Sequence, residues 1–406
     1  MMKVGVIGGG PAGIIAAGFA GSRKKDVTLI ERNDRLGKKL FITGKGRCNI
    51  TNYSPIEDFF ENVMTNSSFL YSSFYSFSNL DIMNLLEKYG VKLKVERGNR
   101  VFPQSDKSSD VIKAFEKFLN DNNVKILFNT RIKDVIYKNK KFVLTSATGE
   151  KMIFDRLILA TGGKSYPATG STGDGYKFAE RLGHTIIPLK PSLVPMEIEE
   201  EWITSTQGLS LKNVTLSGWV DGKKIDERFG EMIFTHYGIS GPIVLSMSNV
   251  INKYLDKNII LKIDLKPALS FEKLDLRLLR DFEISKNKQI KNGLDKLLPK
   301  KLIPIVINLS RIDETKPINQ ITKEERRRIV ENIKNLTMTF KKFRPIEEAI
   351  VTSGGISTDE INPSTMESKI IPGLYFCGEI IDVDALTGGY NLQIAYSTGY
   401  LAGMNV

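Results

Sequence analysis

The chain has 406 residues, more than one compact domain usually contains, and 41% hydrophobic with 26% charged residues is an ordinary globular composition. No apolar run reaches the roughly 18 residues of a transmembrane helix, and a first strand at about Lys3 leaves no room for a signal peptide. Two cysteines, Cys48 and Cys377, exclude a disulfide framework. We therefore expect a cytoplasmic protein of two or three domains with no membrane partner.

The net charge of +12 is concentrated in one segment. Residues 251–345 hold 23 Lys and Arg against 12 Asp and Glu, which leaves 35 basic and 34 acidic residues elsewhere. The basic residues are spread among apolar ones with few aromatics, which favours a solvated helical face over a nucleic-acid-binding patch. The sequence indicates no oligomeric state.

A glycine-rich turn near the N-terminus is the strongest signal in the chain. An apolar run at 4–7 predicts a buried strand, and G-x-G-x-x-G follows at Gly8, Gly10 and Gly13. The first glycine permits a tight turn, the second lets a pyrophosphate approach the backbone, and the third lets helix and strand pack closely. The helix expected from Pro11 offers its N-terminal N–H groups to the phosphates.

A second apolar run, 27–30, ends in Glu31, eighteen residues after Gly13. An acidic side chain at this place hydrogen-bonds the ribose of an adenosine, so the chain is expected to open with a dinucleotide site. The polar, basic loop that follows, 32–52, is similar to the loop that flavoproteins run from adenosine toward flavin. Its Cys48 has no Cys-x4-Cys partner, so we favour a packed side chain over a reactive thiol.

The next elements predict a sheet that is interrupted and then resumed. Helices are expected at 79–89 and 110–119, and strands at 124–128, 132–137, 142–145 and 151–154 are expected to form an antiparallel meander. The buried strand from Arg156 then ends in Thr161-Gly162-Gly163. An Ala-Thr-Gly of this kind closes over FAD in related flavoproteins, and the Thr-Gly-Asp-Gly turn behind it resembles the fumarate reductase and aspartate oxidase superfamily.

From Pro188 onward the sequence shows alternating apolar residues separated by Gly and Pro turns, which is typical of a β-rich module. Strands are expected at 193–198, 214–220, 231–234 and 259–265, followed by Lys-rich helices with a capping box at Thr322–Glu325. There is no second G-x-G-x-x-G. Near Arg344 the chain returns to the first domain, with a strand that ends at Gly378-Glu379 and a last helix, 392–402, behind the glycine pair of 387–391.

Several long motifs together resemble one family, and the similarity covers nearly the whole chain. It is the bacterial FAD-binding flavoprotein family that includes aminoacetone oxidase and bile-acid dehydro-steroid reductases. The motifs lie at 44–52, 162–176, 234–242, 365–369 and 382–391. The family usually has a glycine where this chain has Lys45, so this side chain either changes the preference for substrate charge or points to solvent.

The resemblance implies an α/β fold with a doubly wound, glutathione-reductase- or fumarate-reductase-like FAD domain in two sequence pieces. It places this domain at 1–187 and 345–406, a β-barrel-like module at 188–266 with 338–344, and a helical subdomain at 267–337.

Motifs and resemblance together imply non-covalent FAD and no metal. The residues expected to bind it are Gly8, Gly10, Pro11, Ala12, Gly13, Glu31, Arg32, Lys39, Gly46, Arg47, Cys48, Asn49, Ile132, Thr161, Gly162, Gly163, Gly378, Glu379, Gly389, Tyr390, Asn391 and Leu392.

Three residues are predicted to take part in catalysis. Tyr390 is placed beside the flavin ring, and Arg47 is placed to hold a substrate carbonyl or carboxylate by forked hydrogen bonds. A histidine can exchange a proton near neutral pH, so His236 is the candidate to move a proton, with a hydrogen-bonded loop residue as the alternative. His184, after Gly183, is expected to be structural.

The predicted function is that of an FAD-dependent oxidoreductase which transfers hydride at flavin N5 to or from a small organic substrate. Either NAD(P)H, as a transient visitor, or oxygen is the other redox partner. An amine oxidase of the aminoacetone type, which produces hydrogen peroxide, is one alternative. A flavin-containing, RNA-associated protein that uses the basic segment is an alternative of another class, weakened by the lack of interleaved aromatic residues.

Overall fold

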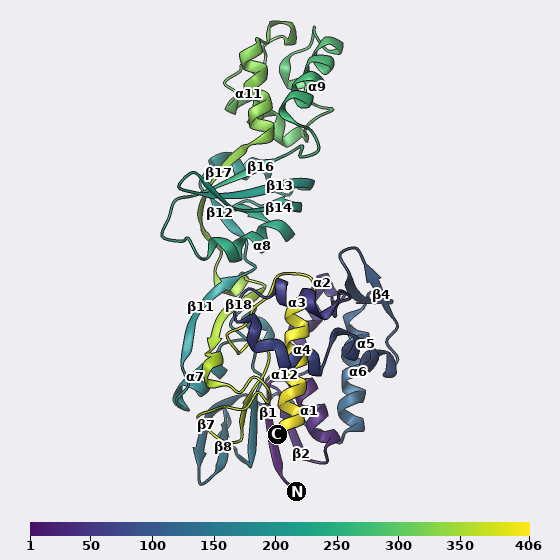
Figure 1. Ribbon diagram of the computed structural model, residues 1–406, viewed down its shortest axis with the longest axis vertical. Helices are drawn as coiled ribbons and strands as arrows, with labels where there is room; N and C mark the ends of the chain where they lie inside the picture. The colour runs from purple at the N-terminus through teal and green to yellow at the C-terminus, as the bar shows by residue number, and fades with distance from the viewer. The chain divides into compact units, whose positions relative to one another are not determined.

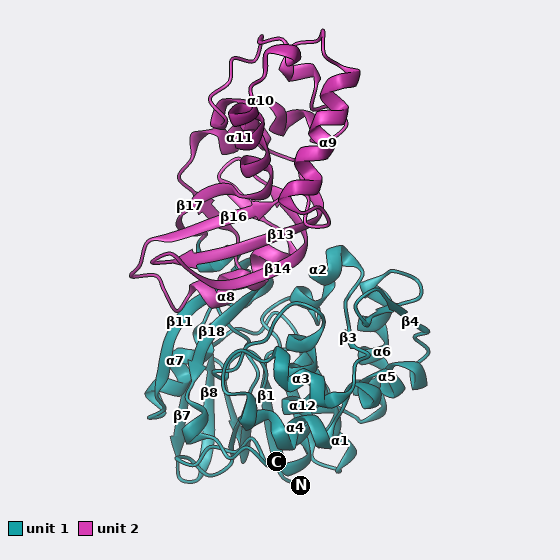
Figure 2. Cartoon of the chain, turned by 45° about the horizontal axis from the view of Figure 1, so that its top comes forward, with its two compact units in different colours: residues 1–192, 345–406 teal, residues 193–344 magenta.

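The computed structural model describes all 406 residues and divides into two compact units (Figure 2). Unit 1 comprises residues 1–192 and 345–406, and unit 2 comprises residues 193–344. Each unit has its own buried hydrophobic core. The sequence predicts domain boundaries between residues 187 and 188 and between residues 344 and 345. The finer division of the inserted part into a β-rich module and a helical subdomain stays a prediction.

A five-stranded parallel sheet forms the centre of unit 1. Its order is β19-β10-β1-β2-β6, and β1 pairs with both β10 and β2. Val4, Val6, Leu157 and Ile158 have no exposed surface, as expected for strands covered on both faces. The strands are β1 (Lys3–Ile7), β2 (Asp26–Ile30), β6 (Lys125–Leu127), β10 (Arg156–Leu159) and β19 (Leu374–Phe376). This confirms the predicted doubly wound α/β fold, with its last strand supplied by the C-terminal piece.

The predicted four-stranded meander was wrong in one strand. Residues 124–128 were assigned to it, but β6 pairs in parallel with β2 and belongs to the main sheet. Parallel pairing with a strand about a hundred residues earlier leaves no local sequence signal. The meander has three strands, β7 (Ile132–Lys138), β8 (Lys141–Ser146) and β9 (Lys151–Phe154).

The other elements of unit 1 surround this sheet (Figure 1). The helices are α1 (Pro11–Ser22), α2 (Lys38–Gly46), α3 (Ile56–Asn62), α4 (Tyr71–Ser76), α5 (Asn79–Lys88), α6 (Ser108–Asp121), α7 (Asp174–Arg181) and α12 (Tyr390–Asn405). The remaining strands are β3 (Thr51–Asn52), β4 (Leu93–Glu96), β5 (Arg100–Pro103), β11 (Ile186–Ser192) and β18 (Val351–Ile356).

The first and last helices, α1 and α12, pack against each other (Figure 1). At Gly399 a Cβ atom would overlap the carbonyl oxygen of Ala12, and at Gly403 it would overlap that of Ala16. The two glycines, one helical turn apart, therefore let the helix backbones approach more closely than any side chain would permit. This contact joins the N-terminal and C-terminal pieces of unit 1.

Unit 2 combines a closed six-stranded barrel with four α-helices (Figure 2). The barrel order is β12 (Met196–Ile198), β15 (Gly238–Ser240), β14 (Lys223–Phe234), β13 (Ser210–Val220), β16 (Ile259–Asp264) and β17 (Leu336–Phe343). The helices are α8 (Pro242–Ile251), α9 (Phe271–Ile284), α10 (Ile303–Leu309) and α11 (Lys323–Lys334). The helices α9, α10 and α11 lie at one end of the barrel, whereas α8 packs against β14 (Figure 2). The predicted capping box of Thr322 and Glu325 is present at the start of α11. None of the helices in the two units is long and apolar enough to cross a membrane.

The glycine contact between α1 and α12 gives the first prediction. Gly399→Ala should destabilise unit 1 by about 1–3 kcal/mol, because the added methyl group must displace a helix backbone. Urea unfolding of the FAD-free protein measures the change, because bound FAD would itself add stability. Gly10→Ala is the matched control, since no atom lies within 4 Å of a Cβ built at Gly10. Equal stability of both variants would contradict this reading of the contact.

Candidate functional site

The carboxyl ends of four neighbouring parallel strands meet at one edge of the unit 1 sheet. Gly8 follows β1, Glu31 follows β2, Ala160 follows β10, and Cys377 with Gly378 follows β19. Ligands of open α/β sheets bind at this edge. The sheet therefore brings together motifs that lie up to 370 residues apart in the sequence.

The glycine turn after β1 has the form of a phosphate cradle. A Cβ at Gly8 would overlap Ala160, and one at Gly13 would overlap Gly8, so both positions need glycine for packing. Gly10 instead faces open space, and no side chain caps the N-terminus of α1, which begins at Pro11 and Ala12. The free space and the uncapped helix end fit a pyrophosphate.

Glu31 lies beside this cradle with only 7% of its surface exposed. One carboxylate oxygen accepts a hydrogen bond from the Gly9 N–H at 2.7 Å, and the other accepts two from Asn33, both at 2.7 Å. The oxygen that accepts from Gly9 has a further lone pair, so the carboxylate can still accept a ribose hydroxyl. The Thr130 N–H donates to the carbonyl of Glu31, which brings Ile132 near the same place.

Arg32 is held by the loop that precedes α7. Its guanidinium donates to Thr172 Oγ1 at 2.7 Å and lies 3.4 Å from the carboxylate of Asp174. Asp174 also binds Arg131, at 3.1 Å. Arg32 thus ties the residues after β2 to the Thr-Gly-Asp-Gly turn, a partner set that the sequence did not reveal.

A charged pair joins two other predicted segments. Lys39 Nζ lies 2.8 Å from Glu379 Oε2 and donates to Ser165 Oγ at 2.7 Å. The same carboxylate accepts the Thr352 N–H at 2.9 Å, and Gly163 packs against both Thr352 and Glu379. The Lys39–Glu379 pair therefore holds three segments in one cluster: the start of α2, the glycine pair after β10, and Gly378-Glu379 after β19.

The glycine-ended strand β10 leaves one buried polar atom without a partner. Thr161 Oγ1 is buried and makes no hydrogen bond. The next residue, Gly162, has a φ of 72°, which other residues rarely adopt. A buried hydroxyl without a partner costs free energy unless a ligand or water satisfies it, so this position also fits a polar cofactor.

The N-terminus of α12 forms the last part of the site. Gly389 precedes Tyr390 with a φ of 106°, and a Cβ there would overlap the backbone of Thr51. No side chain caps the helix. With its amide oriented to suit both neighbours, Asn49 accepts the Gly389 N–H at 3.1 Å and donates to the Thr51 carbonyl at 3.2 Å.

Three more predicted residues lie around this helix end. The Asn391 side chain accepts the Ala385 N–H at 2.9 Å and donates to the Ala385 carbonyl at 2.7 Å, so it fixes the preceding loop. Tyr390 and Leu392 are partly exposed, and the Tyr390 ring meets that of Phe59 edge to face at 5.0 Å. Burial raises the pKa of Tyr390, so its phenol is protonated at neutral pH.

The predicted substrate ligand Arg47 already has partners. Its guanidinium lies 2.6 Å from Glu96 and 2.9 Å from Asp106, and it stacks on Phe102 with 4.1 Å to the ring centroid. The hydrogen bond from Arg47 holds the pKa of Glu96 below its usual value. Arg47 therefore fastens the loop 44–49 to β4 and β5, and a substrate carboxylate would have to displace this pairing.

The rest of this loop is strained. Gly44, Lys45, Gly46 and Cys48 all have φ values between 58° and 84°. Lys45 is exposed, whereas Gly46 faces space free of protein atoms. Cys48 is fully buried, and burial raises the pKa of its thiol to about 12, which agrees with the packed side chain that we favoured.

The two histidines lie in different units. His184 is buried in unit 1, where its Nε2 atom lies 2.7 Å from Ser368 Oγ and burial lowers its pKa, in agreement with a structural role. His236 belongs to unit 2, next to Tyr237, with 4.9 Å between the ring centroids. A catalytic role for His236 stays a prediction.

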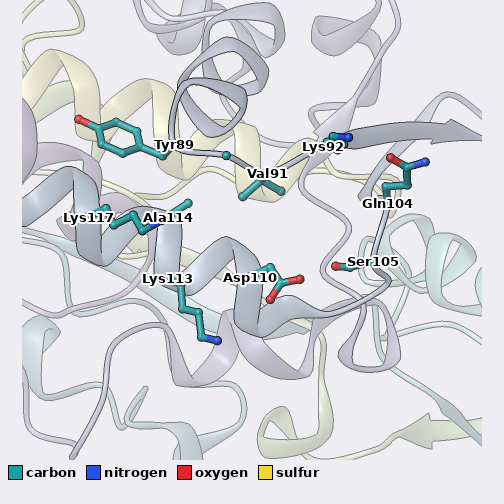
Figure 3. Close-up of a pocket in the computed structure, with 10 residues that line it drawn as sticks. Tyr89, Val91, Lys92, Gln104, Ser105, Asp110, Lys113, Ala114 and Lys117 are labelled. Atoms are coloured by element: carbon teal, nitrogen blue, oxygen red, sulfur yellow. The ribbon is translucent and has the colours of Figure 1, made fainter.

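Unit 1 also contains a hollow of about 480 Å³, which is lined by residues that follow α5, by residues that follow β5 and by α6. Its polar lining includes Lys92, Gln104, Asp110 and Lys113 (Figure 3). The Lys92 and Lys113 side chains do not point toward one another, so no set of convergent groups marks it as a ligand site (Figure 3).

The parallel sheet, the phosphate cradle and the ribose carboxylate define an FAD-dependent oxidoreductase. The chain belongs to the HI0933-like family, whose Rossmann-domain model matches residues 2–405. It is 32% identical to the 3-dehydro-bile acid delta(4,6)-reductase of Clostridium scindens, over 99% of this chain and 98% of the relative. It is 31% identical to the ribosomal RNA dihydrouridine synthase of Haemophilus influenzae, over 99% and 97% of the two chains.

Solved structures share the fold at low sequence identity. A flavocytochrome c3 fumarate reductase superposes with a TM-score of 0.52 at 15% identity and covers 100% of this chain and 78% of its own. The 3-ketosteroid-delta4-(5alpha)-dehydrogenase of Rhodococcus jostii also gives 0.52, at 14% identity, over 100% and 96%. These confirm the predicted fumarate-reductase-like fold.

The open space at Gly10 gives the second prediction. Gly10→Ala should leave the stability of the apoprotein nearly unchanged but weaken FAD binding at least tenfold, because its methyl group occupies the space predicted for the pyrophosphate. The purified wild type should release FAD and not FMN on denaturation. Titration of the apoprotein with FAD, followed by flavin fluorescence, measures the affinity. Unchanged affinity would place the pyrophosphate elsewhere.

The Arg47 network gives a prediction on pH. The pKa of Glu96 is lowered in the folded protein, so the stabilisation from this pair is present above the usual value of 4.5 and is lost as pH falls through the folded pKa. Glu96→Gln should therefore lower the melting temperature at pH 7, and the difference from wild type should shrink below pH 4.5. Glu87→Gln, which removes an exposed carboxylate that forms no ion pair, is the control. A difference that is constant with pH would contradict this account.

Proposed function

We propose that the chain is an FAD-dependent reductase that adds a hydride to a carbon–carbon double bond conjugated to a carbonyl group of a small organic substrate. One observation carries this proposal: full-length relatives with different substrates have names that describe this one reaction. A 3-dehydro-bile acid delta(4,6)-reductase acts on double bonds conjugated to a ring ketone. A dihydrouridine synthase saturates the uracil double bond that is conjugated to a carbonyl.

The residues of the site suit this reaction. When bound, FAD supplies the hydride from its N5 atom. The uncapped N-terminus of α12 presents N–H groups and a positive dipole end, which favour negative charge beside it. The protonated phenol of Tyr390 lies at this helix end and can donate a hydrogen bond to a substrate carbonyl, which withdraws electrons from the double bond.

The second hydrogen arrives as a proton on the carbon next to the carbonyl. We propose His236 as its donor, since an imidazole exchanges protons with water near neutral pH. Arg47 holds the loop 44–49 in place through Glu96 and Asp106, and this is its main proposed role. A direct contact between Arg47 and the substrate is proposed in addition. NADH or NADPH is proposed as the source of electrons, bound only transiently because the chain has no second nucleotide motif.

Uridine in ribosomal RNA is the second candidate substrate. The observation that favours it is the excess of 11 positive charges in residues 251–345, in a chain that is similar over its full length to two ribosomal RNA dihydrouridine synthases. Positive charge of this kind binds phosphates independently of sequence. The alternative reverses the direction of electron transfer: the flavin oxidises an amine, and oxygen then reoxidises the flavin with production of hydrogen peroxide.

An anaerobic stopped-flow experiment tests the proposal. The holoenzyme is reduced with NADH or NADPH and then mixed with a 3-oxo-Δ4 steroid, a uridine-containing RNA oligonucleotide or oxygen. We expect the conjugated substrate to reoxidise the flavin at least tenfold faster than oxygen and to be recovered with the double bond saturated. Reduction of the flavin by aminoacetone, with oxygen as the only effective oxidant, would overturn the reductase proposal.

The roles of the side chains are tested in the same assay. Tyr390→Phe and His236→Ala should slow reoxidation by substrate by roughly 10²-fold, the usual contribution of a proton donor or a hydrogen-bond donor to a developing oxyanion. FAD content should stay normal in both. Full activity of either variant would remove that residue from the proposed mechanism.

A further inference from the structure

One part of unit 1 differs in composition from the rest of the chain. Lys and Arg make up 58 of the 406 residues, yet none lies between positions 48 and 87. The same 40 residues contain the acidic residues Glu57, Asp58, Glu61, Asp81 and Glu87, together with eight of the aromatic ones. This segment forms β3, α3, α4 and α5, so a locally acidic and aromatic region exists within a protein of net charge +12.

Three rings of this segment form an exposed aromatic face, made of Phe60 on α3 and Tyr71 and Tyr75 on α4. Tyr71 is 61% exposed and Tyr75 is 49% exposed. The Tyr71 and Tyr75 ring centroids are 4.7 Å apart, and the Phe60 ring lies nearly parallel to that of Tyr75, at 27° and 6.2 Å. Exposed aromatic clusters of this kind are characteristic of binding surfaces and not of bare protein surface.

The aromatic face is held on a rigid support. Phe59 and Phe74 are fully buried beneath it, with their rings 5.6 Å apart, and Phe74 also meets the Phe60 ring at 5.3 Å. The exposed rings are therefore anchored in the core and are ordered before any partner arrives. A preorganised surface loses less entropy on binding.

The helix that carries Phe60, α3, also carries three carboxylates. Glu57, Asp58 and Glu61 are exposed on α3, and none of them forms an ion pair within the chain. The Tyr75 hydroxyl donates to Glu57 at 3.2 Å, which places one carboxylate at the edge of the rings. Elsewhere in the chain cations do lie over aromatic rings, as Arg47 does over Phe102, but no cation covers these three.

We propose that this aromatic face, with its three carboxylates, binds an arginine-rich segment of a partner protein. A guanidinium group stacks on an aromatic ring and pairs with a carboxylate in fork geometry, so it uses both kinds of group that the face offers. Lysine uses them less well, because its ammonium group is a compact, strongly hydrated charge. Such basic segments are typical of proteins that accompany nucleic acids.

The charge of the face argues against nucleic acid itself as the occupant. Stacking of bases on tyrosines requires basic residues nearby to hold the phosphates. Here the charged residues of α3 are the carboxylates of Glu57, Asp58 and Glu61, which repel a phosphate backbone, and residues 48–87 contain no Lys or Arg. An RNA substrate would therefore bind elsewhere on the chain, and the arginine-rich segment is independent of the proposed function.

The probe for this proposal is a fluorescent octa-arginine peptide, with octa-lysine as its matched control. Anisotropy titrations use the yellow holoenzyme at 0.15 M salt, where long-range attraction is screened. A protein of charge +12 repels both peptides overall, so binding of octa-arginine demands a local acidic site. We expect octa-arginine to bind about tenfold more tightly than octa-lysine.

Two variants assign the binding to the face. Tyr71→Ala with Tyr75→Ala, and Glu57→Gln with Asp58→Asn and Glu61→Gln, should each weaken octa-arginine binding about tenfold. Phe229→Ala, which removes a ring that is 60% exposed in unit 2, should not change it. FAD content and reductase rate should stay normal in all variants, which shows that they are folded.

Other outcomes would overturn the proposal. Undetectable binding of octa-arginine, or binding that the face variants leave intact, would remove the face as its site. An RNA oligonucleotide that competes with octa-arginine for the wild type, and whose own binding the face variants abolish, would assign the face to nucleic acid. Self-association of the wild type in sedimentation velocity that the face variants abolish would make a second copy of the chain the occupant.

Discussion

The close contact between α1 and α12 is the constraint on which unit 1 depends. The helices meet through Gly399 and Gly403, which lie against the backbone at Ala12 and Ala16. The same α1 carries the phosphate cradle at its N-terminus, and α12 carries the glycine pair at its own. Because both helix ends belong to the candidate site, this packing sets the distance between two parts of that site.

Much of this site was predictable from the sequence, because its residues belong to motifs in which spacing encodes backbone geometry. Gly8, Gly13 and Gly389 each stand where a side chain would overlap the backbone of another segment. A glycine requirement of this kind is local and repeats wherever the same turn is made.

The partners of the motif residues were not predictable, because they come from distant segments. Thr172 binds Arg32, Thr352 binds Glu379, and Glu96 binds the guanidinium of Arg47. Nothing in the local pattern around these residues distinguishes them from surface polar residues. The strand β6 was misassigned for the same reason, since its place is decided by pairing with β2 and not by its neighbours in sequence.

One strand pair in unit 1 brings together the two ends of the inserted segment. β11 and β18 are antiparallel, and Ser192, the last residue before unit 2, stands opposite Val351, a few residues after the chain returns at Pro345. The two ends of the insertion are therefore held close together. Closing a long insertion between neighbouring strand ends adds little entropic cost, because loop closure depends only weakly on loop length. Unit 2 can then have its own core and its own charge, while the sheet edge that holds the cofactor residues stays intact.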